Sequence, residues 1–427
     1  MARPVFIVDG SRTPFLKARS GPGPFTPVDL AVQCGRPLLA RQPFGPTAFD
    51  QVILGCVNVI ADEMNPARVA ALRLGMGEKM VAFTVQINCG SGMQSIDTGY
   101  RYIREGVSDL ILAGGSEALS HAPLVWPRQG VRWFAGLAGA RGVAAKIAAA
   151  LKFRPQYLKP IIGLERGLTD PITELNMGQT AEMVGHLFGI SRAQSDAYAA
   201  ESHKRLANAQ GQGWLKGEVE TAFSRDGQFF DHDDGVRPDS SPESLAKLNP
   251  VFERPWGQVT AGNSSQITDG ASWVILASDD AVAKHGLTPR AVILDSQWSA
   301  LDPGIMGLGP VLSATALLKR NNLTLGDVET WELNEAFATQ VLGCLAAWND
   351  DKFCREILGL DGPAGQIDHA KLNVDGGAIS LGHPVGTSGN RIVLHLVNAM
   401  KRLGTRRGIA TECIGGGQGG AMLIETV

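Results

Sequence analysis

The sequence is poor in cysteine, lacks a long hydrophobic run and carries no excess of charge, and each shortage excludes a class of protein. The six cysteines among 427 residues are scattered, with neither the Cys-x-x-Cys spacing of a zinc site nor the density of a disulfide scaffold. The longest uncharged run, residues 80–96, is interrupted by polar residues and glycine, so no membrane span is predicted. A net charge of -3 argues against a dedicated nucleic-acid binder. Because the start also lacks a signal-like region, we expect a cytoplasmic protein with free thiols.

What the sequence does contain is a large apolar fraction and many glycines. Hydrophobic residues make up 44% and charged residues 19% of the chain, as in a protein with a large core. Short apolar runs, such as residues 81–87, 109–113 and 291–294, alternate with segments of helical periodicity. The 52 glycines indicate tight turns and close backbone contacts. These patterns predict an α/β architecture whose second half echoes the first.

Three reactive side chains lie in turns where a substrate could reach them. Cys89 lies between a predicted strand and a predicted helix, where free amides and the helix dipole favour a thiolate, although a buried structural cysteine is the commoner role. His383 is flanked by glycines and is a candidate general base, although single histidines are more often structural. Cys413 ends a predicted strand, and the glycines after it offer N–H groups suited to an oxyanion hole. Asn334, at a strand-to-helix junction, would by itself be read as a helix cap.

Eight segments, in order along the chain, together resemble the motifs of the thiolase family, the coenzyme A-dependent acetyl- and acyltransferases. They are residues 11–15, 88–92, 114–117, 177–182, 260–263, 334–337, 382–384 and 413–417. The resemblance covers essentially the whole chain. It implies the thiolase fold, which is an α/β fold with two similar βα halves in a five-layer αβαβα arrangement and an inserted loop domain. The expected divisions are 1–121 for the first part of the N-terminal half, 122–252 for the loop domain, 253–282 for the completion of that half, and 283–427 for the C-terminal half.

The resemblance also implies a role for each reactive group. Cys89 would be the acylated nucleophile, His383 the base that activates it, and Cys413 the proton donor and acceptor of the other half-reaction. One oxyanion hole would be formed by His383 and a water held by Asn334, and the other by the backbone N–H groups of Cys89 and Gly415. Residues expected near the pantetheine arm and its tunnel are Ser265, Ala336, Phe337 and Met177. No metal or redox cofactor is required, and coenzyme A is a substrate.

The function that follows is reversible thiolytic cleavage of a 3-ketoacyl-CoA to acyl-CoA and acetyl-CoA, as in fatty acid β-oxidation. A thiolate forms an acyl-enzyme readily, and a second acid can protonate the expelled carbanion. A biosynthetic acetoacetyl-CoA thiolase remains an alternative within the family. A ketoacyl synthase would not need the second thiol at Cys413. A non-catalytic lipid carrier or scaffold would need none of Cys89, His383 and Cys413.

The most distinctive part of the insertion is residues 124–166, which carry eight Lys or Arg and one acid, Glu165. These charges alternate with Trp126, Trp133, Phe134 and other apolar residues. One hypothesis is a lid over the acyl tunnel. The other is docking onto a partner hydratase/dehydrogenase of β-oxidation or onto an anionic membrane surface. The family resemblance also implies a homodimer or homotetramer.

Overall fold

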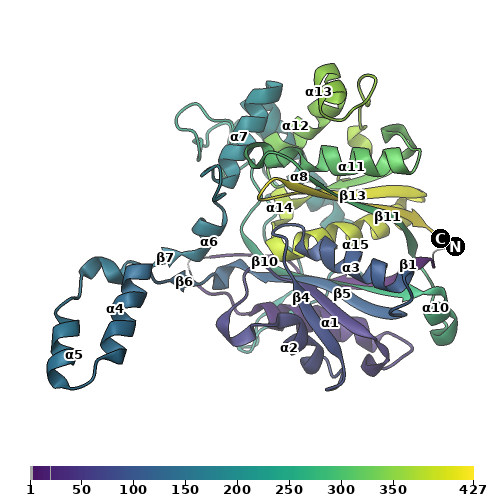
Figure 1. The fold of residues 1–427 in the computed structure, drawn as a ribbon. Helices are drawn as coiled ribbons and strands as arrows, with labels where there is room; N and C mark the ends of the chain where they lie inside the picture. Colours follow the sequence, from purple (N-terminus) through teal and green to yellow (C-terminus); the bar gives the residue numbers. More distant parts are fainter. Residues whose placement is uncertain (1–2, 20) are drawn as a thin grey trace.

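The computed structural model describes residues 3–19 and 21–427, and its main strands form one hydrogen-bonded sheet that folds into two layers (Figure 1). Along the sheet the strands are β4 (Val81–Val85), β3 (Gln51–Gly55), β5 (Leu110–Ala118), β10 (Thr268–Ser278), β1 (Val5–Arg12), β11 (Ala291–Ala300), β14 (Gln418–Thr426), β13 (Arg407–Ile414) and β12 (Thr330–Leu333), and β2 (Leu16–Lys17) pairs with β10. The layers join where β1 pairs with β11, through two residue pairs only. Each half of the sequence therefore builds one layer around its own strands.

Helices cover both outer faces and fill the space between the layers (Figure 1). The first layer is covered outside by α1 (Pro27–Ala40) and α2 (Pro66–Arg73), and the second by α11 (Gly309–Arg320) and α12 (Ala338–Asn349). Between the layers lie α3 (Ser91–Arg104) and α15 (Val385–Leu403), whose apolar sides pack on both layers of the sheet. Shorter helices are α10 (Asp279–His285), α13 (Asp351–Glu356) and α14 (Ala378–Leu381). The expected five-layer αβαβα arrangement is confirmed.

The two central helices meet backbone to backbone at their N-terminal ends. A Cβ added to Gly92 of α3 would lie 2.6 Å from the Asn390 nitrogen and 2.9 Å from the Thr387 carbonyl oxygen of α15. Only glycine permits this approach. The contact brings together the two helix starts that follow Cys89 and His383.

The strand predicted at residues 109–113 is longer in the structure. The sequence predicts a strand that ends at Ala113, before the glycines, whereas β5 continues through Gly114 and Gly115 to Ala118. The glycines here provide close packing rather than a turn, because a Cβ on Gly114 would lie 2.2 Å from the ring of Trp273. Residues 114–117 are therefore part of the sheet.

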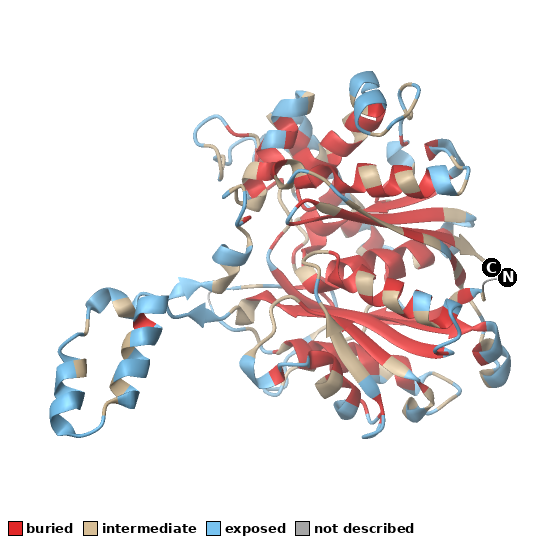
Figure 2. Cartoon of the chain, in the orientation of Figure 1, coloured by how far each residue is buried: buried red, intermediate tan, exposed pale blue. Residues whose placement is uncertain are grey.

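The chain leaves the first layer after β5 and returns at β10, and the intervening segment contains a projecting arm (Figures 1 and 2). The arm, residues 124–166, comprises β6 (Leu124–Val125), α4 (Arg128–Gly139), α5 (Val143–Ala150), β7 (Ile161–Ile162) and most of α6 (Gly163–Gly167). The rest includes α7 (Met177–Phe188), α8 (Arg192–Gly211), β8 (Ala222–Phe223), β9 (Phe229–Phe230) and α9 (Pro242–Leu245). Among the described residues, no helix has both the length and the apolar character needed to cross a membrane.

Candidate active site

One cavity of about 600 Å³ contains the three reactive side chains singled out from the sequence. Cys89, His383 and Cys413 all line it, although they are far apart in the chain. Cys89 lies between β4 and α3, His383 between α14 and α15, and Cys413 near the end of β13. The fold therefore brings the predicted nucleophile, base and second thiol to one space.

Cys89 is a half-buried thiol next to the first turn of α3. Burial raises the pKa of Cys89 to about 12, while backbone N–H groups of Gly415 and of Cys89 itself act in the opposite direction. Both N–H groups therefore favour the thiolate, and backbone donors of this kind are suited to an oxyanion formed on an attached acyl group. Because the raised pKa keeps the resting group a thiol, its reaction needs a base.

His383 has the environment of a neutral imidazole. Its Nδ1 lies 2.6 Å from the Ser388 hydroxyl oxygen, and that hydroxyl donates to the Pro384 carbonyl. This pattern makes Nδ1–H the donor and leaves Nε2 with a free lone pair. Burial, with a smaller contribution from the charge of Arg391, lowers the pKa of His383 to about 4. The imidazole is therefore unprotonated near neutral pH and can accept a proton.

Cys413 faces an apolar part of the cavity wall. It is 1% exposed and packs in a cluster with Met306, Ala336 and Phe337. Burial raises its pKa well above the usual range, and the neighbouring Cys89 thiol adds to this. Cys413 therefore holds its proton at rest and can donate it to a carbanion.

Asn334 lies at the end of β12 and is fully buried without lining the cavity. Neither its Oδ1 nor its Nδ2 has a hydrogen-bond partner among the described residues. The helix-cap interpretation is wrong, because α12 begins at Ala338 and its N-cap residue is Phe337. An orphaned buried amide fits a bound water, but the water-holding role stays a prediction.

The other expected binding residues line the cavity. Ser265, Ala336, Phe337, Met177 and Gly415 all contribute to its wall. The Ser265 N–H donates to the Ala336 carbonyl at 3.0 Å, which ties two of these segments together.

Sequence reasoning missed the part of the wall that comes from the base of the arm. Leu164, Leu168 and Ile172 line the cavity just after β7. No helical spacing marks these positions, because α6 ends at Gly167 and both Leu168 and Ile172 lie beyond it. The base of the arm is therefore part of the cavity.

The role of Glu117 was also missed, although its motif was recognised. Its fully buried carboxylate accepts N–H groups from Val57 at 3.0 Å, Asn58 at 2.9 Å and Gly386 at 3.0 Å. Burial raises the pKa of Glu117 to about 7 against the effect of these donors. Glu117 thus ties the loop after β3 to the first turn of α15, beside His383.

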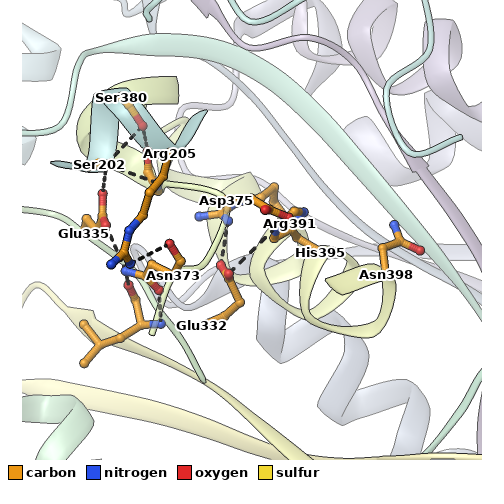
Figure 3. A network of polar contacts seen from close by, with 12 residues as sticks. Ser202, Arg205, Glu332, Glu335, Asn373, Asp375, Ser380, Arg391, His395 and Asn398 are labelled. Atoms are coloured by element: carbon orange, nitrogen blue, oxygen red, sulfur yellow. Dashed lines mark hydrogen bonds and ion pairs between the residues drawn. The ribbon is translucent and has the colours of Figure 1, made fainter. Parts of the chain in front are cut away.

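A network of buried polar contacts supports the segments that carry Asn334 and His383 (Figure 3). Glu335 accepts hydrogen bonds from Tyr198 at 2.9 Å, Ser202 at 2.6 Å and Asn373 at 2.9 Å. In the same region Arg391 pairs with Glu332 at 2.9 Å, with both side chains almost fully buried.

Within the described residues, one cluster has metal-ligand geometry: Glu182, His186 and Glu253, whose ligand atoms lie within 4.8 Å of one another. None of these three residues lines the cavity. Both Glu182 oxygens already accept backbone N–H groups, from Gln258 and Val259.

Comparison with known proteins gives a family match to each half of the chain. Residues 5–280 match the thiolase N-terminal domain and residues 287–426 the thiolase C-terminal domain. A beta-ketoadipyl-CoA thiolase of Pseudomonas aeruginosa is 39% identical, covering 100% of both chains. The mitochondrial trifunctional enzyme subunit beta of Bos taurus is 35% identical, over 99% of this chain and 88% of its own. The crystal structure of human mitochondrial 3-ketoacyl-CoA thiolase in complex with CoA superposes with a TM-score of 0.85 at 36% identity, covering 100% of this chain and 98% of that chain.

Proposed function

The chain belongs to the thiolase family of acyltransferases, and from this premise we propose that it cleaves a 3-ketoacyl-CoA with coenzyme A to give acetyl-CoA and a shortened acyl-CoA. The observation that carries the proposal is the opening of two thiols and one neutral imidazole into one cavity. These are the groups that the reaction needs as nucleophile, base and second acid.

The first half-reaction begins at Cys89. His383 Nε2 takes the Cys89 proton, and the thiolate attacks the keto carbon. The resulting oxyanion is bound by the N–H groups of Cys89 and Gly415, which favour the thiolate. The bond between the α and β carbons then breaks, which leaves the acyl group on Cys89, and Cys413 gives its proton to the expelled enolate carbon. His383, now protonated, and a water on Asn334 are the proposed donors to the enolate oxygen.

The second half-reaction restores both thiols. The Cys413 thiolate takes the proton of an incoming coenzyme A, and the coenzyme A thiolate attacks the acyl-enzyme. Cys89 leaves as a thiolate and recovers its proton from His383. Protons and charges balance over the cycle.

The cavity wall supports an uncharged acyl chain as the substrate. The described residues that line it include no Lys or Arg, and Asp170 is its one charged side chain. The backbone N–H of Thr173 donates to Asp170 and lowers its pKa, so this group is anionic. An acyl chain that ends in a carboxylate would be buried without a cation and near an anion, which is unfavourable. We therefore propose a neutral 3-ketoacyl-CoA rather than the substrate named in the beta-ketoadipyl relative.

A matched pair of substrates tests this proposal. 3-Ketohexanoyl-CoA and beta-ketoadipyl-CoA have equal chain lengths and differ in the terminal carboxylate. We expect cleavage of the first to be faster, and a preference for the second would refute the assignment. A series from four to sixteen carbons then separates the alternatives. Activity confined to four carbons, with efficient condensation of acetyl-CoA, would identify a biosynthetic acetoacetyl-CoA thiolase.

The arm supports a second proposal, attachment to an anionic membrane surface. Its eight Lys and Arg are exposed, and none forms an ion pair with any described residue (Figure 2). Val143, Ile147 and Leu151 follow a four-residue spacing along α5 and are 76%, 56% and 81% exposed. Trp133 holds the two arm helices together, because its indole N–H donates to the Ala149 carbonyl at 3.0 Å. Val143, Ile147 and Leu151 thus remain available for burial in a membrane. Each cation near anionic lipid contributes about 1 kcal/mol to the free energy of binding.

Charge reversal of Arg141, Lys146, Lys152 and Arg154 to Glu tests the attachment. The matched control exchanges Lys and Arg at the same four positions, which keeps every charge. We expect the reversed variant, and not the control, to stop sedimenting with anionic vesicles at low salt. Unchanged sedimentation would refute the proposal, and loss of thiolysis alone would identify a lid. If the wild-type chain does not sediment with vesicles and binds a β-oxidation hydratase/dehydrogenase, the arm is a protein-docking surface; one relative is named as a subunit of a trifunctional enzyme.

We also propose a homodimer or homotetramer in the cytoplasm. The oligomer is supported by the family and by β4, which ends the sheet and leaves Val81 57% exposed. The compartment is supported by six free cysteines. Analytical ultracentrifugation and cell fractionation test the two statements.

A further inference from the structure

A single side chain ties the turn that carries Cys89 to the turn that follows Cys413. Asn88 Nδ2 donates to the Gly415 carbonyl oxygen at 2.8 Å, across 327 positions of the sequence. Gln86 Nε2 in turn donates to Asn88 Oδ1 at 3.3 Å, which fixes the orientation of the Asn88 amide. Asn88 itself has a φ of 47°, a left-handed conformation that asparagine tolerates better than most residues.

The turn that Asn88 holds consists of glycines, whose backbones have the widest choice of conformations. Residues 415–417 are three glycines between β13 and β14, and Gly416 and Gly417 have φ values of 93° and 79°. The far end of the turn is fixed, because the Leu301 N–H donates to the Gly417 carbonyl at 2.8 Å. At the near end, the Gly415 carbonyl is held by Asn88, and Gly415 lines the same cavity as Cys89, whose pKa its backbone N–H lowers.

We propose that Asn88 is a positioning residue that holds the Gly415 N–H against Cys89, so that this donor is in place for the thiolate and for the oxyanion. The position requires a short side chain that donates a hydrogen bond and tolerates a positive φ, and Asn meets both needs. Asp shares the shape and the φ tolerance but presents only acceptors to a carbonyl oxygen. The role at the oxyanion rests on the proposed function, whereas the role at the thiolate does not.

The test uses Asn88→Gly, which removes the donor and relieves the backbone, and Asn88→Asp, which keeps the shape without the donor. The matched control is Asn322→Asp, because Asn322 is an exposed asparagine with a φ of 56°. Two rates are measured on the full chain: alkylation of Cys89 by iodoacetamide as a function of pH, and acyl-enzyme formation from acetyl-CoA by rapid quench and mass spectrometry. The titratable groups near the sulfur, namely Cys413, His383, Glu412 and Glu117, are unchanged in every variant. Asn88→Asp adds a carboxylate that by itself raises the pKa of the thiol, so the uncharged Asn88→Gly decides the alkylation result.

Both Asn88 variants are expected to shift the alkylation profile of Cys89 to higher pH, because its thiolate loses a fixed donor. Acyl-enzyme formation should be about 100- to 1000-fold slower, the range for a misplaced or missing oxyanion donor. The dissociation constant of coenzyme A and the behaviour of Asn322→Asp should match the wild type.

A wild-type alkylation profile and a wild-type acylation rate in Asn88→Gly would overturn the proposal. The proposal would also be overturned if Asn88→Gly lowered the yield of folded protein while the remaining folded protein reacted at the wild-type rate. The contact made by Asn88 would then be purely structural. If the wild-type chain fails to cleave any 3-ketoacyl-CoA, the proposed function fails, while the alkylation profiles still decide the role of Asn88.

Discussion

Replacement of Glu412 by methionine is expected to stabilise the protein, although Glu412 is next to Cys413, the proposed proton donor. Glu412 is fully buried on β13, where its Oε1 lies against Gly389 of α15. Neither carboxylate oxygen has a hydrogen-bond partner among the described residues. A buried polar group left without a partner costs about 1–3 kcal/mol. Glu412→Met keeps the length of the side chain and removes both oxygens, so the free energy of unfolding should rise by about 1–3 kcal/mol near neutral pH.

The gain should also grow with pH. Burial raises the pKa of Glu412 well above the usual range, with Arg391 acting in the opposite direction. Above the pKa of the unfolded chain, about 4.3, the unfolded state releases a proton that the folded state keeps. The contribution of Glu412 to the free energy of unfolding is therefore largest below that pH. It decreases as pH rises toward the folded pKa, by up to about 1.4 kcal/mol per pH unit. The variant lacks this loss.

Glu332→Met is the matched control for the same measurement. Glu332 is also fully buried, but it pairs with Arg391 at 2.9 Å. Its removal leaves a buried guanidinium without that partner and should cost about 3–5 kcal/mol. Urea unfolding followed by tryptophan fluorescence, at about pH 5 and pH 8, measures both variants. If Glu412→Met destabilises the protein, or if its advantage is independent of pH, then the carboxyl group has a partner and this reasoning is refuted.

Three further predictions concern the reactive groups. Cys89→Ser should abolish the acyl-enzyme, and mass spectrometry that finds the acyl group elsewhere with Cys89 free would contradict the mechanism. Cys413→Ala should retain part of the acylation by acetyl-CoA but lose carbon–carbon cleavage and formation, whereas equal loss of both in a folded variant would contradict the division of roles. Because burial lowers the pKa of His383 to about 4, NMR titration of its imidazole should show no protonation step near 6.5, and such a step would refute the neutral, buried base.

The three side chains that meet in the cavity could be picked out from the sequence because each lies within a short local pattern. Cys89 lies in the short glycine-containing turn between β4, which ends at Val85, and α3, which begins at Ser91. His383 and Cys413 are marked by their glycines in the same way. The alternation of apolar strands with helical periodicity predicted the α/β class, and the five layers were implied by the family resemblance.

What could not be predicted depends on contacts between distant parts of the chain. Neither segment alone contains a pattern that predicts the hydrogen bond from Asn88 to Gly415. Nothing local separates Glu332, which has a buried partner, from Glu412, which has none. Gly114 was read as the end of a strand because a glycine needed for packing against Trp273 looks the same in sequence as one needed for a turn.

The backbone contact between α3 and α15 determines how the active site responds to change. Because Gly92 lies directly against the main chain of α15, no rotamer and no side-chain volume enters the spacing between the two helix starts. Heating, pressure or sequence drift can repack the surrounding core and still leave that spacing intact. The spacing between the turns that carry Cys89 and His383 thus tolerates gradual change in the core, whereas a single methyl group added at residue 92 would disturb it.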